Sequence, residues 1–214
     1  YSDASACGNE IASEKPMVRK YIIDSLCYWA SEYHIDGFRF DLMGVLDIET
    51  LNEARKALLK INPDIIMYGE GWTGGESTLP ESERGMKINA PRTPGIGMFS
   101  DDIRDAVKGH VFYMDELGFV NGAADRGEEL KQAVTCAKWA KSPMQSINYL
   151  SCHDNYTLWD RFIISNSHES EEMRIRMNKL AAAILFTAQG VPFFLHGEEF
   201  ARTKISEADG APVE

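Results

Sequence analysis

The chain has 214 residues, of which 44% are hydrophobic and 26% charged, a composition typical of a globular protein with an apolar core. Asp and Glu outnumber Lys and Arg by 33 to 22, and no basic cluster is present that could neutralise the phosphates of a nucleic acid. No apolar run approaches the roughly 20 residues of a membrane span, so we expect neither nucleic acid nor a membrane as a partner.

The predicted elements alternate between helix and strand from the start of the chain. The first helix is expected to be capped by Ser13 and to run through Pro16, with apolar residues at helical spacing as far as Tyr33. The stretch "IDGFRFD" predicts a short strand that ends near Asp41. A second helix covers residues 51–61, and the next strand covers residues 65–68 and leads to Glu70.

The same alternation continues through the second half of the chain. We expect strands at "PGIGMFS", "QSINYLSCHD" and "VPFFLHGEE", helices at residues 101–107 and 171–188, and long loops at residues 73–94 and 117–142. The four cysteines are scattered without a C-x-x-C pair, which predicts free thiols and argues against zinc.

Alternating strands and helices predict an α/β fold with a parallel sheet, either open or closed into a barrel. Residues able to do chemistry follow several different strands: Asp41, Glu70, Asp154, Glu198 and Glu199. Such convergence from several strand ends is typical of a (β/α)8 barrel. Five strand-helix units indicate only about strands 4 to 8, so residues 1–214 are expected to be the C-terminal part of a barrel. With an open sheet edge, the isolated segment is expected to be inactive.

The stretch "IIMYGEGWTGG" has two interpretations. Gly69, Gly71 and Gly74 form a G-x-G-x-x-G pattern after a strand, which is typical of a dinucleotide-binding turn. That turn must lead directly into a helix, but Pro80 interrupts the following segment, and residues 88–94 contain no acidic ribose contact. The alternative is that Glu70 is a catalytic carboxylate, and we favour it.

Side chains alternate along "GFRFD", so Phe38 and Phe40 are expected to pack under helices while Arg39 and Asp41 face the barrel mouth. A guanidinium beside a carboxylate favours its ionised form, as a nucleophile requires. Arg39 and Asp41 could equally form a structural ion pair.

Two further strand ends carry candidate residues. Glu70 lies beside Trp72, and an aromatic wall would favour a protonated carboxyl group of the kind used as a general acid, although an ordinary loop glutamate fits as well. His153 and Asp154 could bind a substrate or a metal, or cap a helix, but as neighbours on a strand they are expected to point in opposite directions. Carboxylates at three strand ends with tryptophans nearby suit sugar chemistry.

Several motifs resemble type I pullulanases of the α-amylase superfamily of glycoside hydrolases. The stretch "IDGFRFDLMG" resembles their nucleophile strand, "YGEGW" their acid/base strand, and "NYLSCHDNYTLWDR" the region of their third carboxylate. Three other stretches are also similar: "GNEIASEKPMVRKYIIDS", "NAPRTPGIGMFSDDIRDAVKG" and "AQGVPFFLHGEEFARTK".

The resemblance implies hydrolysis of α-1,6-glucosidic branch linkages in pullulan, starch or glycogen-type α-glucans by a retaining mechanism. It implies Asp41 as the nucleophile, Glu70 as the general acid/base and Asp154 as the stabiliser of the transition state. The residues it implies as substrate contacts are Arg39, His153, Trp72, Asn155 and Asn9. The resemblance also implies that the N-terminal strands, the accessory β domains and the C-terminal β domain lie outside this chain.

Two alternatives to this function stay open: an isoamylase-like or glycogen-debranching relative, and a non-catalytic α-glucan-binding module. We expect no cofactor. Asp101, Asp102 and Asp105 could suggest a calcium site, because calcium binds several oxygen atoms. Acidic residues are common at helix N-termini for electrostatic reasons alone, so the sequence does not support calcium. The sequence leaves the compartment open.

Overall fold

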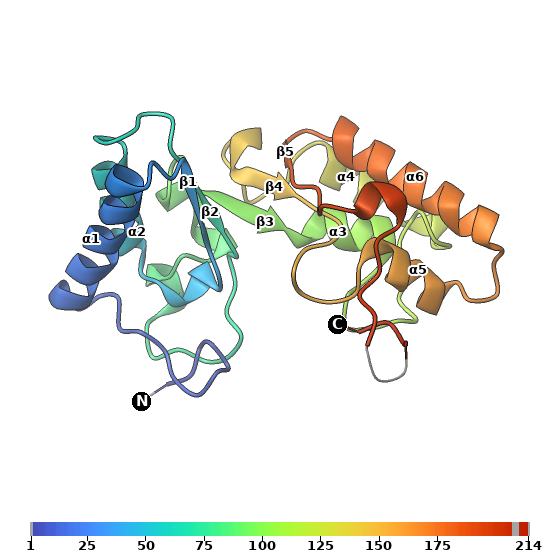
Figure 1. Cartoon of the computed structure of the whole chain (residues 1–214), viewed down its shortest axis with the longest axis horizontal. Coiled ribbons are helices and arrows are strands. Elements are labelled where there is room, and N and C mark those ends of the chain that lie inside the picture. Colours follow the sequence, from blue (N-terminus) through green and yellow to red (C-terminus); the bar gives the residue numbers. More distant parts are fainter. Residues whose placement is uncertain (1, 207–209, 214) are drawn as a thin grey trace. The chain divides into compact units, whose positions relative to one another are not determined.

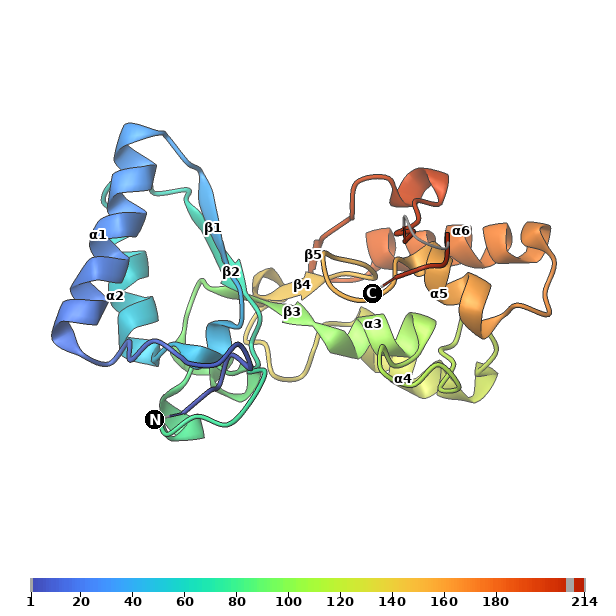
Figure 2. The same ribbon diagram turned by 60° about the horizontal axis from the view of Figure 1, so that its bottom comes forward.

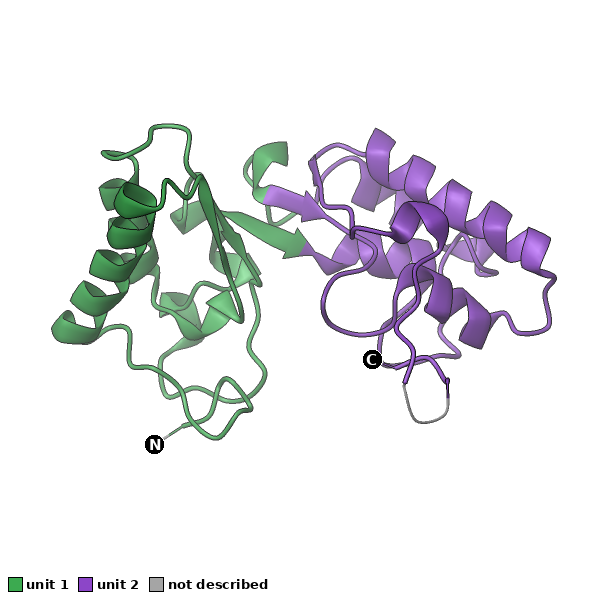
Figure 3. Cartoon of the chain, viewed as in Figure 1, with its two compact units in different colours: residues 1–99, 138–145 green, residues 100–137, 146–214 purple. Residues whose placement is uncertain are grey.

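The computed structural model describes residues 2–206 and 210–213. It divides into two compact units, one of residues 1–99 and 138–145 and the other of residues 100–137 and 146–214 (Figure 3). Each unit has its own hydrophobic core. No helix in the described part of the chain combines the length and the apolar character that crossing a bilayer requires.

The first unit is built around parallel strands with two helices against them. Its elements are α1 (Pro16–Glu32), β1 (Gly37–Phe40), α2 (Ile48–Leu58), β2 (Ile66–Gly69) and β3 (Gly97–Ser100), the last residue of which opens the second unit. Strand β1 pairs with β2 from Gly37↔Ile66 to Phe40↔Gly69, and β2 pairs with β3. Helices α1 and α2 lie side by side and cover the same side of β1 and β2 (Figures 1 and 2).

The core of the first unit lies between these helices and the strands. Phe38 and Phe40 pack against a cluster that includes Leu51, Leu58 and Met67, as their alternation with Arg39 and Asp41 predicts. Side chains on one face of β1 therefore build the core, while the other face is left for polar residues.

The cap of α1 differs from the prediction. The helix begins at Pro16 after Lys15, which makes no side-chain cap, whereas the hydroxyl of Ser13 donates to Asp47 (2.7 Å) and accepts from its backbone N–H (2.8 Å). Asp47 in turn caps α2 by accepting from the N–H of Thr50. Ser13 thus connects the segment before α1 to the N-cap residue of α2 and does not itself cap α1.

In its described residues, the second unit combines two short parallel strands with four α-helices. Its elements are α3 (Asp101–Lys108), α4 (Gly127–Val134), β4 (Ser146–Asn148), α5 (Leu158–Ser165), α6 (Glu171–Thr187) and β5 (Val191–Pro192). Strand β4 pairs with β5 at Ile147↔Val191 and Asn148↔Pro192. The hydrophobic core of the second unit includes Val107 of α3, Phe162 of α5 and Leu185 of α6.

Three predictions for the second unit need correction. Strands β4 and β5 are shorter than the apolar runs that predict them. Tyr149 and Leu150, which follow β4, are buried although they lie outside the strand pairing. Helix α4 lies in a stretch predicted as loop, where Gly127 at the helix start gave no helix signal. His153 and Asp154 consequently lie in the loop between β4 and α5, and not on a strand.

Short 3₁₀ helices complete the described structure. They cover Met43–Val45, Glu81–Glu83, Lys87–Arg92, Ala124–Arg126, Pro143–Gln145 and Glu198–Phe200. All four cysteines are free thiols, as predicted.

Candidate active site

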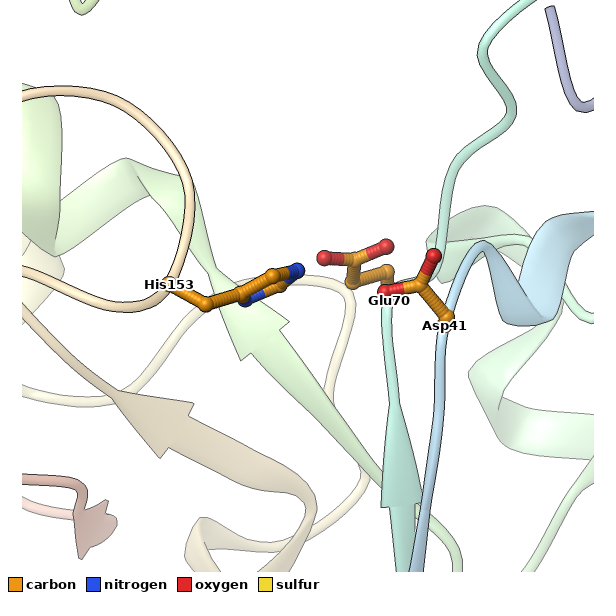
Figure 4. A group of neighbouring side chains, drawn as sticks. All are labelled: Asp41, Glu70 and His153. Atoms are coloured by element: carbon orange, nitrogen blue, oxygen red, sulfur yellow. The ribbon is translucent and has the colours of Figure 1, made fainter. Parts of the chain in front are cut away.

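The parallel pairing of β1 and β2 places Asp41 and Glu70 at the same edge of the sheet. Phe40 is in register with Gly69, and the N–H of Glu70 donates to the carbonyl of Phe40 (3.1 Å). Asp41 and Glu70 are therefore the first residues beyond two adjacent strands. Figure 4 shows their carboxyl groups beyond the strand ends, and also His153 on the loop after β4.

Arg39 bridges the two carboxylates. Its Nη1 donates to Oδ1 of Asp41, and its Nη2 donates to Oε1 of Glu70 (2.5 Å). The second oxygen of Glu70 accepts from the backbone N–H of Leu42 (2.7 Å), which has the left-handed backbone angles φ 41° and ψ 51°. The sequence predicted Arg39 beside Asp41, but the contact of Arg39 with Glu70 joins residues 31 positions apart in the chain.

The two carboxylates differ in exposure although they share one guanidinium. The side chain of Asp41 is 65% exposed, whereas that of Glu70 is 3% exposed. An oxygen of Asp41 and an oxygen of Glu70 lie within 4.8 Å of each other. Carboxyl groups separated by roughly 5 to 5.5 Å are typical of retaining glycosidases, in which one carboxylate attacks and the other exchanges a proton.

The glycines around Glu70 accommodate the protein's own backbone. A Cβ atom on Gly69 would lie 2.6 Å from the carbonyl oxygen of Phe40, and one on Gly74 would lie 2.8 Å from the carbonyl oxygen of Ser5. Both distances are too short for a real side chain, so glycine is required for close packing at these positions. These two glycines of the G-x-G-x-x-G pattern are thus accounted for by close packing within the protein.

Trp72 and Asn9 were predicted from the resemblance as substrate contacts in this unit. The ammonium of Lys87 lies 5.4 Å from the centre of the Trp72 ring, a cation–π contact. Asn9 lines a cavity of about 380 Å³ together with Glu10, Ser77 and other residues, and neither Asp41 nor Glu70 lines that cavity. The roles of Trp72 and Asn9 stay predictions.

The second unit carries His153, Asp154 and Asn155 in the loop between β4 and α5. The side chains of His153 and Asp154 are 54% and 60% exposed, and Nε2 of His153 lies 3.6 Å from Oδ1 of Asp154. The expectation that they point in opposite directions is wrong, because the alternation of a strand does not apply in a loop. Asn155 has φ 60°, a left-handed conformation that non-glycine residues adopt rarely.

Two buried ionisable residues of the second unit were not recognised as a pair from the sequence. Lys108 ends α3 and Glu198 begins a 3₁₀ helix, and they are 2% and 4% exposed. Burial lowers the pKa of Lys108 to about 7, assisted by the charge of Arg104 and opposed by that of Glu198. Burial likewise raises the pKa of Glu198 to about 7, with Lys108 acting in the opposite direction. Each group thus resists carrying its charge inside the fold.

These shifts predict a minimum in the contribution of the pair to stability near pH 7. Between pH 4.5 and about 7, folded Glu198 keeps a proton that the unfolded chain has lost, so the free energy of unfolding falls as pH rises. Between about pH 7 and 10.5, the unfolded chain keeps a proton that folded Lys108 has lost, so the free energy of unfolding rises again. At about 1.36 kcal/mol per pKa unit, the fall amounts to on the order of 3 kcal/mol and the rise to on the order of 5 kcal/mol.

The double substitution Lys108→Met with Glu198→Gln tests this pair. Its gain in the free energy of unfolding over the wild type should be largest near pH 7 and smaller toward about pH 5 and pH 9, as measured by urea unfolding. The control is the double substitution Lys131→Met with Glu128→Gln. It alters an exposed pair in which Nζ of Lys131 lies 3.6 Å from Oε1 of Glu128. Its effect should stay within about 0.5 kcal/mol at every pH. A gain from Lys108→Met with Glu198→Gln that did not vary with pH would contradict the prediction.

A family model and several known proteins match nearly the whole chain. The family model described as "Alpha amylase, catalytic domain" matches residues 6–212. A pullulanase of Bacillus subtilis (strain 168) is 42% identical over 210 residues, which are 95% of this chain and 29% of that protein. The chloroplastic pullulanase 1 of Arabidopsis thaliana is 32% identical and is matched over 98% of this chain and 28% of its own length.

Solved structures agree with these relatives. A pullulanase of Anoxybacillus sp. LM18-11, crystallised with maltotetraose, has a TM-score of 0.93 and 46% identity, covering 99% of this chain and 30% of that one. A pullulanase of Paenibacillus barengoltzii, in complex with maltohexaose and α-cyclodextrin, has a TM-score of 0.90 and 49% identity, covering 95% of this chain and 33% of that one. The expected fold class, an α/β segment of a (β/α)8 barrel, is thereby confirmed. The chain spans about 30% of the length of these relatives.

Proposed function

The chain belongs to the family of α-amylase catalytic domains, and from this premise we propose that the protein carrying it hydrolyses α-1,6-glucosidic linkages in branched α-glucans. The observation that carries the proposal is the bridge from Arg39 to an exposed Asp41 and a buried Glu70 at adjacent strand ends. The choice of linkage rests on the similarity to pullulanases. On the same basis, residues 1–214 belong to about strands 4 to 8 of the catalytic barrel.

The proposed reaction proceeds in two displacements. In the first, an oxygen of Asp41 bonds to the anomeric carbon while the bond from that carbon to the glycosidic oxygen breaks, and Glu70 gives its proton to the leaving oxygen. In the second, water gives a proton to Glu70 while its oxygen attacks the anomeric carbon and releases Asp41. Two inversions at one carbon give net retention of configuration.

The remaining site residues have supporting roles in this proposal. Asp154 stabilises the transition state, and His153 and Asn155 contact the sugar, as their resemblance to the pullulanase motif implies. Arg39 donates to Asp41 and so holds the side chain of the nucleophile in place. Trp72 and Asn9 are proposed as further substrate contacts.

A comparison of two glucans tests the linkage. The full-length protein should release reducing ends from pullulan, which contains α-1,6 linkages, and at most about a hundredth as fast from linear amylose, which lacks them. Release mainly from amylose would overturn the linkage assignment and leave a hydrolase of the same family. Binding of glucan without release from either substrate would favour the non-catalytic module. An isoamylase-like relative would instead prefer the branch points of glycogen to pullulan.

A further inference from the structure

A lysine near the end of the chain holds the loop that carries His153 and Asp154. The Nζ atom of Lys204 donates to the carbonyl oxygen of His153 (2.5 Å) and to that of Asn155 (2.6 Å). These carbonyls belong to the residues on either side of Asp154. One ammonium group therefore restrains the backbone both before and after Asp154.

Lys204 is itself anchored to the helix that follows the loop. Its backbone N–H donates to Oδ2 of Asp160 (2.8 Å), and the same oxygen accepts from the hydroxyl of Thr157 (2.8 Å). Asp160 and Thr157 are buried, and Thr157 caps α5 by accepting from the N–H of Asp160. The anchor is thus part of the unit's interior, whereas the loop that Lys204 restrains is exposed.

The conformation of the loop explains why such a restraint is needed. Asn155 has φ 60°, a left-handed conformation that asparagine adopts more readily than most other non-glycine residues and that turns the chain sharply after Asp154. The carbonyls of His153 and Asn155 converge on one point, and two carbonyl dipoles directed at one point repel each other unless a donor lies between them. The ammonium of Lys204 supplies that donor and charge together.

We propose that Lys204 is a positioning residue for the reaction, which keeps Asp154 and His153 in their working arrangement without contacting the substrate. The proposal rests on the hydrolase function and deepens it. A displacement of about 1 Å in a working group can reduce a rate by about 10²-fold. Because Asp154 is assigned to the transition state, the loss should appear mainly in kcat, with only a small rise in KM from the displaced sugar contacts His153 and Asn155.

Kinetics of the full-length Lys204→Met variant test this role. Its kcat on pullulan should fall by about 10- to 100-fold, with KM changed by less than about threefold. Lys204→Arg, which keeps the charge and can still donate to two carbonyls, should recover part of kcat. Lys131→Met removes an exposed lysine of the same unit and should leave both constants within about twofold. A rise in KM alone would overturn positioning in favour of direct substrate binding, and unchanged kinetics would overturn it outright.

Crystal structures of the wild type and of Lys204→Met provide a readout that does not depend on activity. The backbone of residues 153–155 should be displaced or lose order in the variant, while Thr157 and Asp160 stay in place. An unchanged loop would overturn the proposal even if the rate fell. If the wild type does not act on pullulan but the loop still loosens in the variant, the proposed hydrolase function is wrong. The restraint of the loop by Lys204 then stands.

Discussion

The Asp41→Asn variant of the full-length protein should lose hydrolysis of pullulan by on the order of 10⁴-fold or more, because an amide cannot form the covalent glycosyl ester that the mechanism requires. Asparagine keeps an oxygen that can accept from Arg39, so the arrangement of the site and the affinity for maltotriose should change little. Release of reducing ends from pullulan measures the first effect, and calorimetric titration with maltotriose measures the second.

A control and a trapping experiment make the test of Asp41 specific. Asp24→Asn alters an exposed aspartate of α1 that pairs with Lys20, and its activity should stay within about twofold of the wild type. A fluorinated glycosyl fluoride that slows breakdown of the intermediate should add one sugar mass to the wild type, at Asp41, and none to Asp41→Asn. Labelling of another residue would overturn the assignment of the nucleophile.

Replacing Glu70 with glutamine should have the second largest effect. Loss of the general acid/base should reduce the rate on pullulan by about 10²- to 10⁴-fold. A maltotriosyl fluoride substrate should avoid the loss in the first displacement, because fluoride leaves without needing a proton from a general acid. Added azide should avoid the loss in the second displacement, because azide attacks the intermediate without a general base. The variant should therefore form maltotriosyl azide from the fluoride at a rate within about tenfold of wild-type turnover.

The contrast between the two variants distinguishes the two carboxylates. Asp41→Asn should not be rescued by fluoride as leaving group or by azide, since the intermediate itself cannot form. Glu172→Gln, in the first turn of α6, is the matched exposed control and should behave as the wild type. Rescue of Asp41→Asn together with failure to rescue Glu70→Gln would reverse the two assignments. Glu70 is buried and accepts hydrogen bonds from both Arg39 and Leu42, so its substitution can also change stability. The melting temperature of each variant should therefore be measured beside its kinetics.

Much of the first unit could be predicted from the sequence because its signals are local. The alternation in "GFRFD" predicted which side chains of β1 pack into the core, and the structure confirms Phe38 and Phe40 there. The break at Asn62-Pro63 and the apolar run after it predicted β2, which covers Ile66–Gly69. Both strand ends, and hence the positions of Asp41 and Glu70 along the chain, follow from these short-range patterns.

The errors arose where a local signal had more than one reading. Ser13 before Pro16 reads as a helix cap, yet its hydroxyl bonds to Asp47, 34 positions away. The run "QSINYLSCHD" reads as a long strand, yet only Ser146–Asn148 pairs, and the buried residues after it fill the core without a strand partner. Burial and strand pairing both select apolar residues, so composition alone does not separate them.

The sequence by itself determined the α/β alternation, the strand ends that carry Asp41 and Glu70, and the motifs through which the family is recognised. Only the tertiary structure decided that Arg39 bridges both carboxylates, that Lys108 and Glu198 are buried close enough to shift each other's pKa, and that Lys204 holds the loop around Asp154. The physical reason is one of range. Periodicity and turn chemistry act over a few residues. The contact of Arg39 with Glu70 joins residues 31 positions apart, Lys108 and Glu198 are 90 positions apart, and both pairings depend on how strands and helices pack.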